Sequence, residues 1–549
     1  MLKVFLTLFY TSFLYANTII YNTNVYTVDE DLPHAQALVI ENEKIIYIGK
    51  STNALAFQTE DSTLIDAKNR FIMPGLIDSH THTALAALLF NTGVNLYKAK
   101  GKKAILEKIK AYKETHPDLS LYTGVGFYPY AFGPNGPTKE ILDEIFPDTK
   151  AFFISNNGHQ AWANSMTLDY LGINKSTPDP LPNVHYYVRN TKGEPTGFMI
   201  EGEAFWPHLK SLGIGKKETF KKVLHDFLPQ FSALGVTAVY DASIASLEES
   251  AYAALNELED EKKLDLRYLA SHFILSTKDA KQASQELKRL QSIYNNELFQ
   301  VSSIKFINDN SDDDNFGIQF KEEALSKYLV PILKADQDLM IHTTQDSSIH
   351  QALNAISTVK KELPGSTSRI TLAHVNMVRD TDFKRFKELD IVANIQPFDA
   401  QGGGYYEYRY VLYGDKWENK LARYRHFFDE GVRVSASSDY PACNKPLQEC
   451  SPFHGIQIGM TRQKIGAIAD QEVLASADER LSLEQSIRAY TINGAYQLHL
   501  EDKIGSLEVG KEADLIILDR NPFETRTEDI HMIQVLQTFI KGKSIYEKH

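Results

Sequence analysis

Short apolar runs with the alternation of β-strands open and close the chain. They cover residues 18–21, 37–41 and 44–48 near the start, and residues 513–518, 533–540 and 544–546 near the end. Neither group has enough strands to form a core of its own, because an isolated pair of strands is marginally stable in water. We therefore expect residues 17–73 and 504–549 to combine into one small β-sandwich domain.

Eight further apolar runs lie between the two ends and alternate with segments of helical periodicity. They cover residues 76–82, 236–241, 266–272, 303–309, 338–342, 370–374, 391–396 and 432–439. From the second run onward their spacing is near the ~30 residues per strand-helix unit of an eight-stranded barrel. The expected fold class is α/β, with a (β/α)8 TIM barrel over residues 74–503.

The interval between the first and second runs is far longer than one strand-helix unit. The excess predicts a large insertion after the first barrel strand, over about residues 87–212. It contains strand-like runs of its own at residues 121–127 and 151–155, and a turn-rich stretch at residues 133–137. An insertion at this point is expected to lie over the active face of the barrel.

The first sixteen residues differ from the rest of the chain. Lys3 precedes an apolar run over residues 4–14, and Ala16 provides a small residue before Asn17. This arrangement is typical of a signal peptide over residues 1–16 and predicts an exported protein, periplasmic or secreted; an N-terminal core strand is the alternative. The run is shorter than the about 20 apolar residues of a membrane span, so no stable membrane insertion is expected after signal removal.

Charge and cysteine content narrow the class of partner. The chain has 71 acidic and 58 basic residues, with a formal net charge of −13, which would repel a phosphate backbone. Nucleic acid is therefore not an expected partner. The two cysteines, Cys443 and Cys450, close a short loop in which a disulfide and two free thiols are both open. A cysteine-based metal site is not expected.

Polar residues that suit a metal centre gather at or near the C-terminal ends of the predicted barrel strands. They are His80, His82, Lys305, His342, His374 and Asp439. His80 and His82 point to the same face because side chains alternate along a strand, and two neighbouring imidazoles can hold one divalent cation. Catalytic groups of barrel enzymes collect at this face, so the set predicts a metal enzyme.

With these motifs the sequence resembles the amidohydrolase superfamily, in particular the amidohydrolase family 3 branch that contains N-substituted formamide deformylase. The similar segments are PGLIDSHTH at 74–82, NGHQAWANS at 157–165, GEPTGFMIE at 193–201, IKFIND at 304–309, IHTTQD at 341–346, AHVNMV at 373–378, SSDYP at 437–441 and IGSLEVGKEADLIILD at 504–519. The resemblance spans nearly the whole chain after the signal segment.

The resemblance implies a role for each residue of the set. His80 and His82 would bind one metal, and His342 and His374 a second. Lys305, carboxylated by carbon dioxide, would bridge the two as a carbamate, because an ammonium would repel dications; a lysine snorkelling from the strand end or paired to Asp309 is the alternative. Asp439 would contact the metal and act as general acid and base, an ordinary strand-end aspartate being the alternative.

The insertion supplies further candidates for substrate binding. They are His159, Trp162, Asn164 and Glu201, three of them within the family-like motif at residues 157–165. Packing is an equal alternative for Trp162, and a turn for Asn164 with Ser165. A solvated surface position is the alternative for Glu201.

The function implied is hydrolysis of a non-peptide carbon–nitrogen bond, the amide of a small N-substituted substrate, by metal-activated hydroxide. Hydrolysis of an ester, lactone or cyclic imide at the same site, or a catalytically silent ligand-binding barrel, are the alternatives. The expected cofactor is one or two divalent ions, zinc first, although iron, manganese or nickel also suit these ligands. Asn310, Gln345 and Ala373 depart from the pattern of many relatives, so the substrate is not carried over. The partner is a small molecule, and the oligomeric state is open, a homodimer being one option.

Overall fold

The computed structural model describes residues 17–274, 277–310, 315–317, 322–401, 420–443, 445–467, 473–474 and 477–548. The signal peptide expected over residues 1–16 lies outside these ranges. Within them, no helix combines the length and apolar character needed to cross a membrane.

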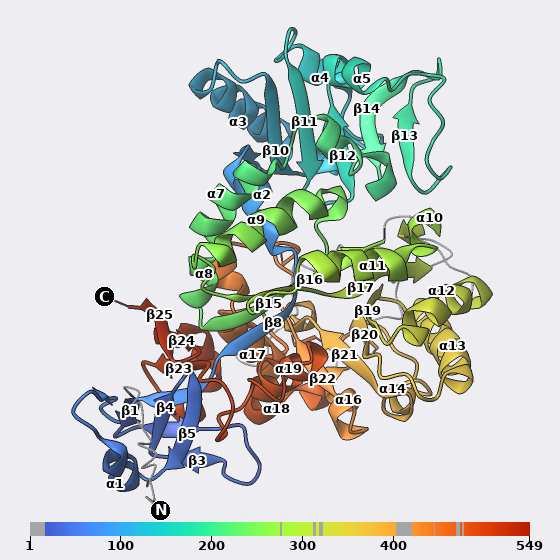
Figure 1. Ribbon diagram of the computed structural model, residues 1–549. Coiled ribbons are helices and arrows are strands. Elements are labelled where there is room, and N and C mark those ends of the chain that lie inside the picture. The colour runs from blue at the N-terminus through green and yellow to red at the C-terminus, as the bar shows by residue number, and fades with distance from the viewer. Residues whose placement is uncertain are drawn as a thin grey trace, which may run out of the picture.

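Eight parallel strands form the central sheet (Figure 1). In spatial order they are β8 (Leu76–Thr81), β15 (Val236–Asp241), β16 (Arg267–Phe273), β17 (Phe299–Asn310), β19 (Asp338–Thr343), β20 (Ile370–His374), β21 (Ile391–Ile395) and β22 (Val434–Ala436). A short strand, β18 (Asn315–Gly317), pairs with β17 beside this series. The prediction of an α/β fold with eight parallel barrel strands in this order is confirmed.

The seam between the first and last strands is closed by hydrogen bonds rather than by a regular ladder. The backbone N–H of Asp439 donates to the carbonyl of His80 at 2.9 Å, and the N–H of His82 donates to the carbonyl of Tyr440 at 2.7 Å. The hydroxyl of Ser79 donates to the carbonyl of Ala436 at 2.9 Å. These bonds make the sheet a nearly closed barrel, with the seam next to the predicted site.

The predicted strand limits need correction at the last strand. The run over residues 432–439 was expected to be one strand, but β22 covers only Val434–Ala436. The chain leaves the strand after Ala436, and Asp439 has φ 51°, which a pleated strand does not allow. Asp439 is therefore held by a turn at the strand end.

Helices cover the outside of the barrel. They are α2 (Thr83–Asn91), α7 (Lys217–Phe227), α8 (Pro229–Ser232), α9 (Glu248–Asp260), α10 (Thr277–Ala280), α11 (Ala283–Ile293), α12 (Glu322–Lys334), α13 (Asp346–Glu362), α14 (Phe383–Glu388), α16 (Tyr424–Asp429), α17 (Pro452–Thr461) and α18 (Leu483–Ala489). A further helix, α19 (Ile492–Gln497), packs instead against the inward-facing side chains of the barrel. Leu339 and Ile341 of β19 face outward and belong to the same apolar cluster as Leu353 of α13. Met340, between them, faces inward with Leu498. This alternation fills both faces, as in a packed barrel.

Strands from both ends of the chain meet in one sheet. Its order is β25 (Lys543–Glu547), β24 (Val535–Ile540), β23 (Leu515–Leu518), β7 (Phe71–Pro74), β2 (Asn24–Tyr26) and β3 (His34–Ala35). A second sheet has the order β5 (Lys44–Gly49), β4 (Ala37–Glu41), β1 (Thr18–Tyr21) and β6 (Thr63–Asp66). The antiparallel pairing of β23 with β7 joins the two ends of the chain, and Ile40, Ile72 and Leu515 share an apolar cluster of these sheets.

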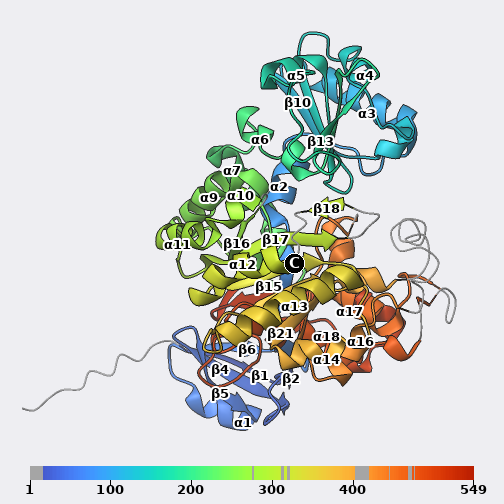
Figure 2. The ribbon, with the colours of Figure 1, turned by 90° about the vertical axis from the view of Figure 1, so that its right-hand side faces the viewer.

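The segment between β8 and β15 contains a sheet of its own. Its order is β13 (Tyr186–Arg189), β14 (Pro195–Ile200), β12 (Gln160–Ala163), β11 (Lys150–Ser155), β10 (Leu121–Phe127) and β9 (Val94–Asn95), with helices α3 (Gly101–Thr115), α4 (Lys139–Asp143) and α5 (Ser165–Leu171). In Figure 2 this sheet lies on the side of the barrel opposite the chain-end strands. It has a separate apolar core that includes Phe153 and Trp162.

Cys443 and Cys450 are joined by a disulfide. The bond therefore decides between the two alternatives that the sequence leaves open. It closes the loop that follows Asp439.

Candidate metal centre

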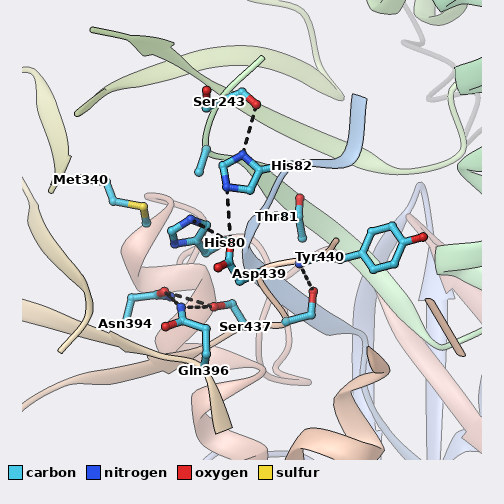
Figure 3. Close-up of polar contacts among 12 residues, drawn as sticks. His80, Thr81, His82, Ser243, Met340, Asn394, Gln396, Ser437, Asp439 and Tyr440 are labelled. Atoms are coloured by element: carbon cyan, nitrogen blue, oxygen red, sulfur yellow. Dashed lines mark hydrogen bonds and ion pairs between the residues drawn. The ribbon is translucent and has the colours of Figure 1, made fainter. Parts of the chain in front are cut away.

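Three ligand atoms meet at the seam of the barrel. His80 is in β8, His82 follows that strand, and Asp439 follows β22, so parallel strands bring the three side chains to one end of the barrel (Figure 3). The Oδ1 atom of Asp439 lies 3.4 Å from Nε2 of His80 and 3.3 Å from Nε2 of His82. The candidate ligand atoms of the three residues lie within 4.8 Å of one another.

The other predicted ligands continue from this group. The amine Nζ of Lys305 lies 3.2 Å from Nε2 of His80, and Lys305 is 2% exposed. The rings of His80 and His374 have centroids 5.0 Å apart, and those of His374 and His342 are 4.1 Å apart. The structure therefore brings together the six residues that the sequence placed at the strand ends.

Burial controls the charge of the group. It lowers the pKa values of His80 and His374 well below the usual histidine range, helped by neighbouring cations, so both rings are neutral at pH 7. Burial also lowers the pKa of Lys305 to about 7, against the opposing effect of Asp439. The pKa of Asp439 is lowered because its contacts with His82, His374 and Lys305 outweigh its burial. The same contact with Asp439 outweighs burial at His82 and raises its pKa.

This donor set fits a divalent cation. Neutral imidazoles offer a lone pair, and a carboxylate adds a negative oxygen, which is the ligand combination of catalytic zinc sites. Nε2 of His374 is fully buried and has no hydrogen-bond partner among the described residues. A buried polar atom without a partner is costly, and a bound ion is one way to satisfy it.

The tautomer of His82 is set by its environment. Its Nδ1 lies 3.2 Å from the carbonyl oxygen of Ser243, which can only accept a hydrogen bond. Nδ1 therefore carries a proton, and Nε2, which faces Asp439, is the nitrogen left to bind a cation. Such a contact fixes the orientation of a metal-binding imidazole.

Unusual backbone conformations lie at the strand ends that carry the group. His374 has φ 74°, Val375 has φ 41° and Asp439 has φ 51°. Each costs of order 1–3 kcal/mol in a residue other than glycine, and Val375 is β-branched, which makes it a marked outlier. The N–H of Val375 is held by the carbonyl of Thr343 at 3.0 Å. The surrounding barrel thus holds His374 and Asp439 in conformations that the free chain avoids.

Two predicted substrate residues form a pair in the segment between β8 and β15. Nδ1 of His159 lies 3.1 Å from Oε2 of Glu201, and the N–H of Glu201 donates to the carbonyl of His159 at 2.8 Å. Glu201 has φ 63° and ψ 158°, a region almost restricted to glycine. Shortly after Glu201, the carbonyl of Trp206 accepts a hydrogen bond from Ser246, in the loop that follows β15. The chain that carries the pair thus reaches the C-terminal end of the barrel.

Trp162 and Asn164 have structural roles. Trp162 is fully buried among aromatic rings, and its Nε1 donates to the carbonyl of Thr138 at 2.9 Å. Asn164 is fully buried at the N-cap of α5, where its Oδ1 accepts from the N–H of Thr167 at 3.0 Å. These contacts account for both side chains, so we assign them to the folding of this sheet rather than to the substrate pocket.

A polar network beneath the centre was not predicted. It consists of three buried amide side chains, Gln497, Asn394 and Gln396, which we call the amide relay. Asn394 and Gln396 stand two apart in the apolar segment IVANIQ, so they share one face. Two amides on the inward face of a buried strand are the signal that the sequence offered for this network.

Comparisons with known proteins agree with this geometry. The sequence profile of the amidohydrolase family matches residues 63–546. The chain belongs to the amidohydrolase family. Members of this family use a divalent metal, and the enzyme is a hydrolase of carbon–nitrogen bonds other than peptide bonds.

Individual relatives cover almost the whole chain. N-substituted formamide deformylase of Arthrobacter pascens is 27% identical over 553 aligned residues, which cover 96% of this chain and 98% of the relative. Among solved structures, a metal-dependent hydrolase of Pyrococcus horikoshii has a TM-score of 0.71 at 22% identity, covering 93% of this chain and 99% of that chain. An adenosine deaminase of Xanthomonas campestris with bound zinc has a TM-score of 0.55 at 13% identity, covering 96% and 92%. At these identities the two structures support the fold.

Proposed function

We propose that this amidohydrolase cleaves the amide bond of a small N-substituted substrate. The observation that carries the proposal is the meeting of His80, His82 and Asp439 within 4.8 Å, next to Lys305, at the C-terminal end of the barrel strands. The similarity to N-substituted formamide deformylase over 96% of the chain supports the choice of an amide.

His80, His82, His342, His374 and Asp439 would hold one or two divalent ions, zinc being our first choice. When bound, such an ion polarises a substrate carbonyl and lowers the pKa of a coordinated water toward about 7.

Asp439 handles protons in this scheme. Its lowered pKa keeps the carboxylate ionised at neutral pH, so it can accept a proton from the attacking water. It then delivers that proton to the leaving nitrogen, which departs only when protonated. Held by a backbone bond from its own N–H to His80, the carboxylate has little freedom to leave this position.

We further propose that Lys305 reacts with carbon dioxide to form a carbamate. Only a neutral amine attacks carbon dioxide, and a pKa of about 7 leaves a large neutral fraction at physiological pH. The ammonium first loses a proton to give the neutral amine. The amine nitrogen then bonds to the carbon, one C=O π bond of carbon dioxide breaks, and the nitrogen loses a second proton to solvent, so that a cation has become an anion with two oxygen ligands. An anion beside His80 suits a site for dications better than an ammonium does.

The architecture and location are proposals of the same kind. Residues 17–73 and 504–549 would form a β-sandwich unit beside the barrel of residues 74–503, and residues 87–212 an insertion whose His159–Glu201 pair binds substrate. We also propose export through a signal peptide at residues 1–16, which the disulfide between Cys443 and Cys450 supports, since disulfides persist in oxidising compartments. The mature enzyme would act on a small molecule, with a homodimer as its candidate assembly.

The test combines metal content with a substrate panel. Protein purified without chelators and supplied with bicarbonate should contain one or two divalent ions per chain and hydrolyse secondary amides. Asp439→Asn should lower kcat by at least about a hundred-fold, the lower range for general acid–base catalysis. Asp382→Asn is the matched control, because Asp382 is also a buried aspartate paired with a histidine, His350 at 2.9 Å, but away from the centre.

The outcomes separate the competing functions. Turnover of esters, lactones or cyclic imides without amides would replace the proposed substrate class but keep the site. Tight ligand binding without product in the metal-loaded protein would indicate a silent binding barrel. Near-normal turnover by Asp439→Asn would refute the assigned proton transfer.

A further inference from the structure

The amide relay runs from the backbone of the metal-binding strand to a side chain beside the centre. Gln497, Asn394 and Gln396 are 6%, 0% and 2% exposed. In Figure 3, Asn394 and Gln396 lie together with Ser437, close to His80 and Asp439.

The direction of every hydrogen bond in the relay follows from its first acceptor. The carbonyl oxygen of Ser79 lies 2.8 Å from Nε2 of Gln497, and a carbonyl can only accept. Gln497 therefore turns its NH2 group to Ser79 and its Oε1 to Asn394. That Oε1 accepts from Nδ2 of Asn394 at 3.1 Å, which leaves Oδ1 of Asn394 facing Gln396.

The last amide is fixed by the same reasoning. Nε2 of Gln396 donates to Oδ1 of Asn394 at 2.8 Å and to the hydroxyl of Ser437 at 2.9 Å. Rotating the Gln396 amide by half a turn would set its oxygen against Oδ1 of Asn394, with two acceptors in contact. Gln396 therefore presents only its oxygen, Oε1, to its remaining surroundings.

This oxygen is buried and has no hydrogen-bond partner within the described part of the chain. Both N–H groups of the Gln396 amide donate within the relay, so its oxygen is the polar atom of the side chain that can still form a hydrogen bond. A buried acceptor without a donor costs about 1–3 kcal/mol, which a bound donor would relieve. The relay thus fixes the orientation of an acceptor oxygen that forms no hydrogen bond within the described fold.

The position of Gln396 relates this oxygen to the reaction. In the parallel pairing of β21 with β22, Asn394 lies opposite Ser435, so Gln396 comes opposite Ser437. Ile395 and Ala436 point outward to the helices, which places Gln396 and Ser437 on the inward face. Asp439 stands two residues after Ser437, in the turn beyond β22, and Figure 3 shows Gln396 and Ser437 below Asp439, so Gln396 lies at the floor of the centre.

We propose that Gln396 is a specificity-determining residue whose Oε1 accepts a hydrogen bond from an N–H group of the substrate. This rests on the proposed amide hydrolysis and narrows it to substrates with an N–H next to the scissile carbonyl: secondary amides, ureas and cyclic imides with a free N–H. Tertiary amides are disfavoured because they lack the donor. Esters and lactones are disfavoured more, because their oxygen sets a second acceptor against Oε1.

The experiment compares three matched probes: acetanilide, N-methylacetanilide, which lacks the N–H, and phenyl acetate, which has an oxygen in its place. Wild-type enzyme should favour acetanilide over N-methylacetanilide by about ten-fold or more. The preference is measured as the ratio of kcat/KM values if both compounds are turned over, and otherwise as the ratio of Kd values from calorimetry. In Gln396→Met this ratio should fall toward one, and phenyl acetate should gain on acetanilide. Metal content and melting temperature establish that the variant is folded and loaded.

Gln337→Met is the matched control. Gln337 is also a buried glutamine whose Oε1 has no partner in the described structure, but it precedes β19 at the opposite end of the barrel. This variant should keep the wild-type ratio. Gln396→Asn retains the amide but shortens the side chain by one methylene group, which moves the oxygen back. This variant should also lower the preference for acetanilide over N-methylacetanilide.

The outcomes separate this proposal from the proposed function. If the wild type turns over no amide, amide hydrolysis fails, while the ratio of dissociation constants still tests Gln396. A wild-type ratio near one would overturn the role of Gln396, whether or not its variants fold. If folded Gln396→Met kept the wild-type ratio of acetanilide to N-methylacetanilide, the role of Gln396 would be overturned too. Its oxygen would then be assigned a hydrogen bond from a bound water.

Discussion

The contact between the barrel and the chain-end sheet yields a quantitative prediction. Arg267 is the first residue of β16, and its guanidinium binds the carboxylate of Asp514 in two places, Nε to Oδ2 at 2.7 Å and Nη2 to Oδ1 at 3.0 Å. The side chains of Arg267 and Asp514 are 4% and 1% exposed, and Glu512 adds a second carboxylate. The pKa of Arg267 is raised because these partners outweigh the effect of burial.

Arg267→Met should cost about 3–5 kcal/mol of unfolding free energy, because it leaves a buried carboxylate without its cation. Asp514 retains a hydrogen bond from the N–H of Lys541 at 2.9 Å, which favours the lower end of that range. The double variant Arg267→Met/Asp514→Asn should recover about 1–3 kcal/mol of the loss, since the more deeply buried of the two carboxylates is then neutral and only Glu512, which is 16% exposed, keeps its charge.

The measurement is urea unfolding followed by circular dichroism, with the four proteins of the double-mutant cycle side by side. Lys103→Met provides the control, because Lys103 and Glu107 form an ion pair at 3.9 Å that is 90% and 65% exposed. Such a pair contributes less than about 1 kcal/mol. A loss below about 1 kcal/mol in Arg267→Met, or additive losses in the double variant, would refute the reasoning.

Three further predictions follow from the described contacts. Trp162→Phe should lower the free energy of unfolding by about 1–3 kcal/mol, because the carbonyl of Thr138 loses its hydrogen-bond donor. The values of kcat and KM should stay unchanged. A raised KM in a stable variant would indicate that Trp162 lines the substrate pocket after all. A chelator should lower the melting temperature, and zinc should restore it. At a zinc concentration of a hundred times Kd, the free energy of unfolding should rise by about 2.7 kcal/mol per site. The rise in melting temperature on adding zinc should be smaller in Asp439→Asn than in the wild type, and equal rises would contradict the role of Asp439 as a ligand. Burial first, then His531 and Lys445, lowers the pKa of His454 to about 4, so the unfolded chain binds its proton below pH 6.5 before the folded chain does. Titration of His454 should therefore lower the free energy of unfolding by up to about 3 kcal/mol as the pH falls from 6.5 to 4. In urea titrations, His454→Gln should reduce the dependence of this free energy on pH over that range. An unchanged dependence would exclude His454 as the cause.

The meeting of the candidate metal ligands at one end of the barrel could be predicted, because each of these residues is recognisable from its local sequence. A histidine or lysine at the end of an apolar strand is chemically unusual, and the parallel barrel brings all such ends to one face. The eight strands were predictable for a similar reason, since strands buried on both faces are continuous apolar runs.

Features that depend on distant pairings were beyond the sequence. The run FIMPGLI over residues 71–77 is uniformly apolar, yet its first part, β7, pairs with β23, and only from Leu76 does the chain enter the barrel. Gly75 marks the change of sheet, because a Cβ there would lie 2.3 Å from the side chain of Thr237. That requirement exists only in the folded chain, as do the direction of the amide relay and the burial of Trp162.

If the centre binds a cation as proposed, the seam of the barrel makes that binding depend on completion of the barrel. His80 and His82 lie on one side of the seam and Asp439 on the other, joined by the hydrogen bond from Asp439 to the backbone of His80. A growing chain holds the two histidines early, but lacks the carboxylate until nearly the whole barrel has been made. A chain that ends early, or a barrel that fails to close, would therefore lack part of the proposed ligand set and would gain less stability from a cation. Proteolysis of unloaded chains would then remove unfinished molecules before finished ones.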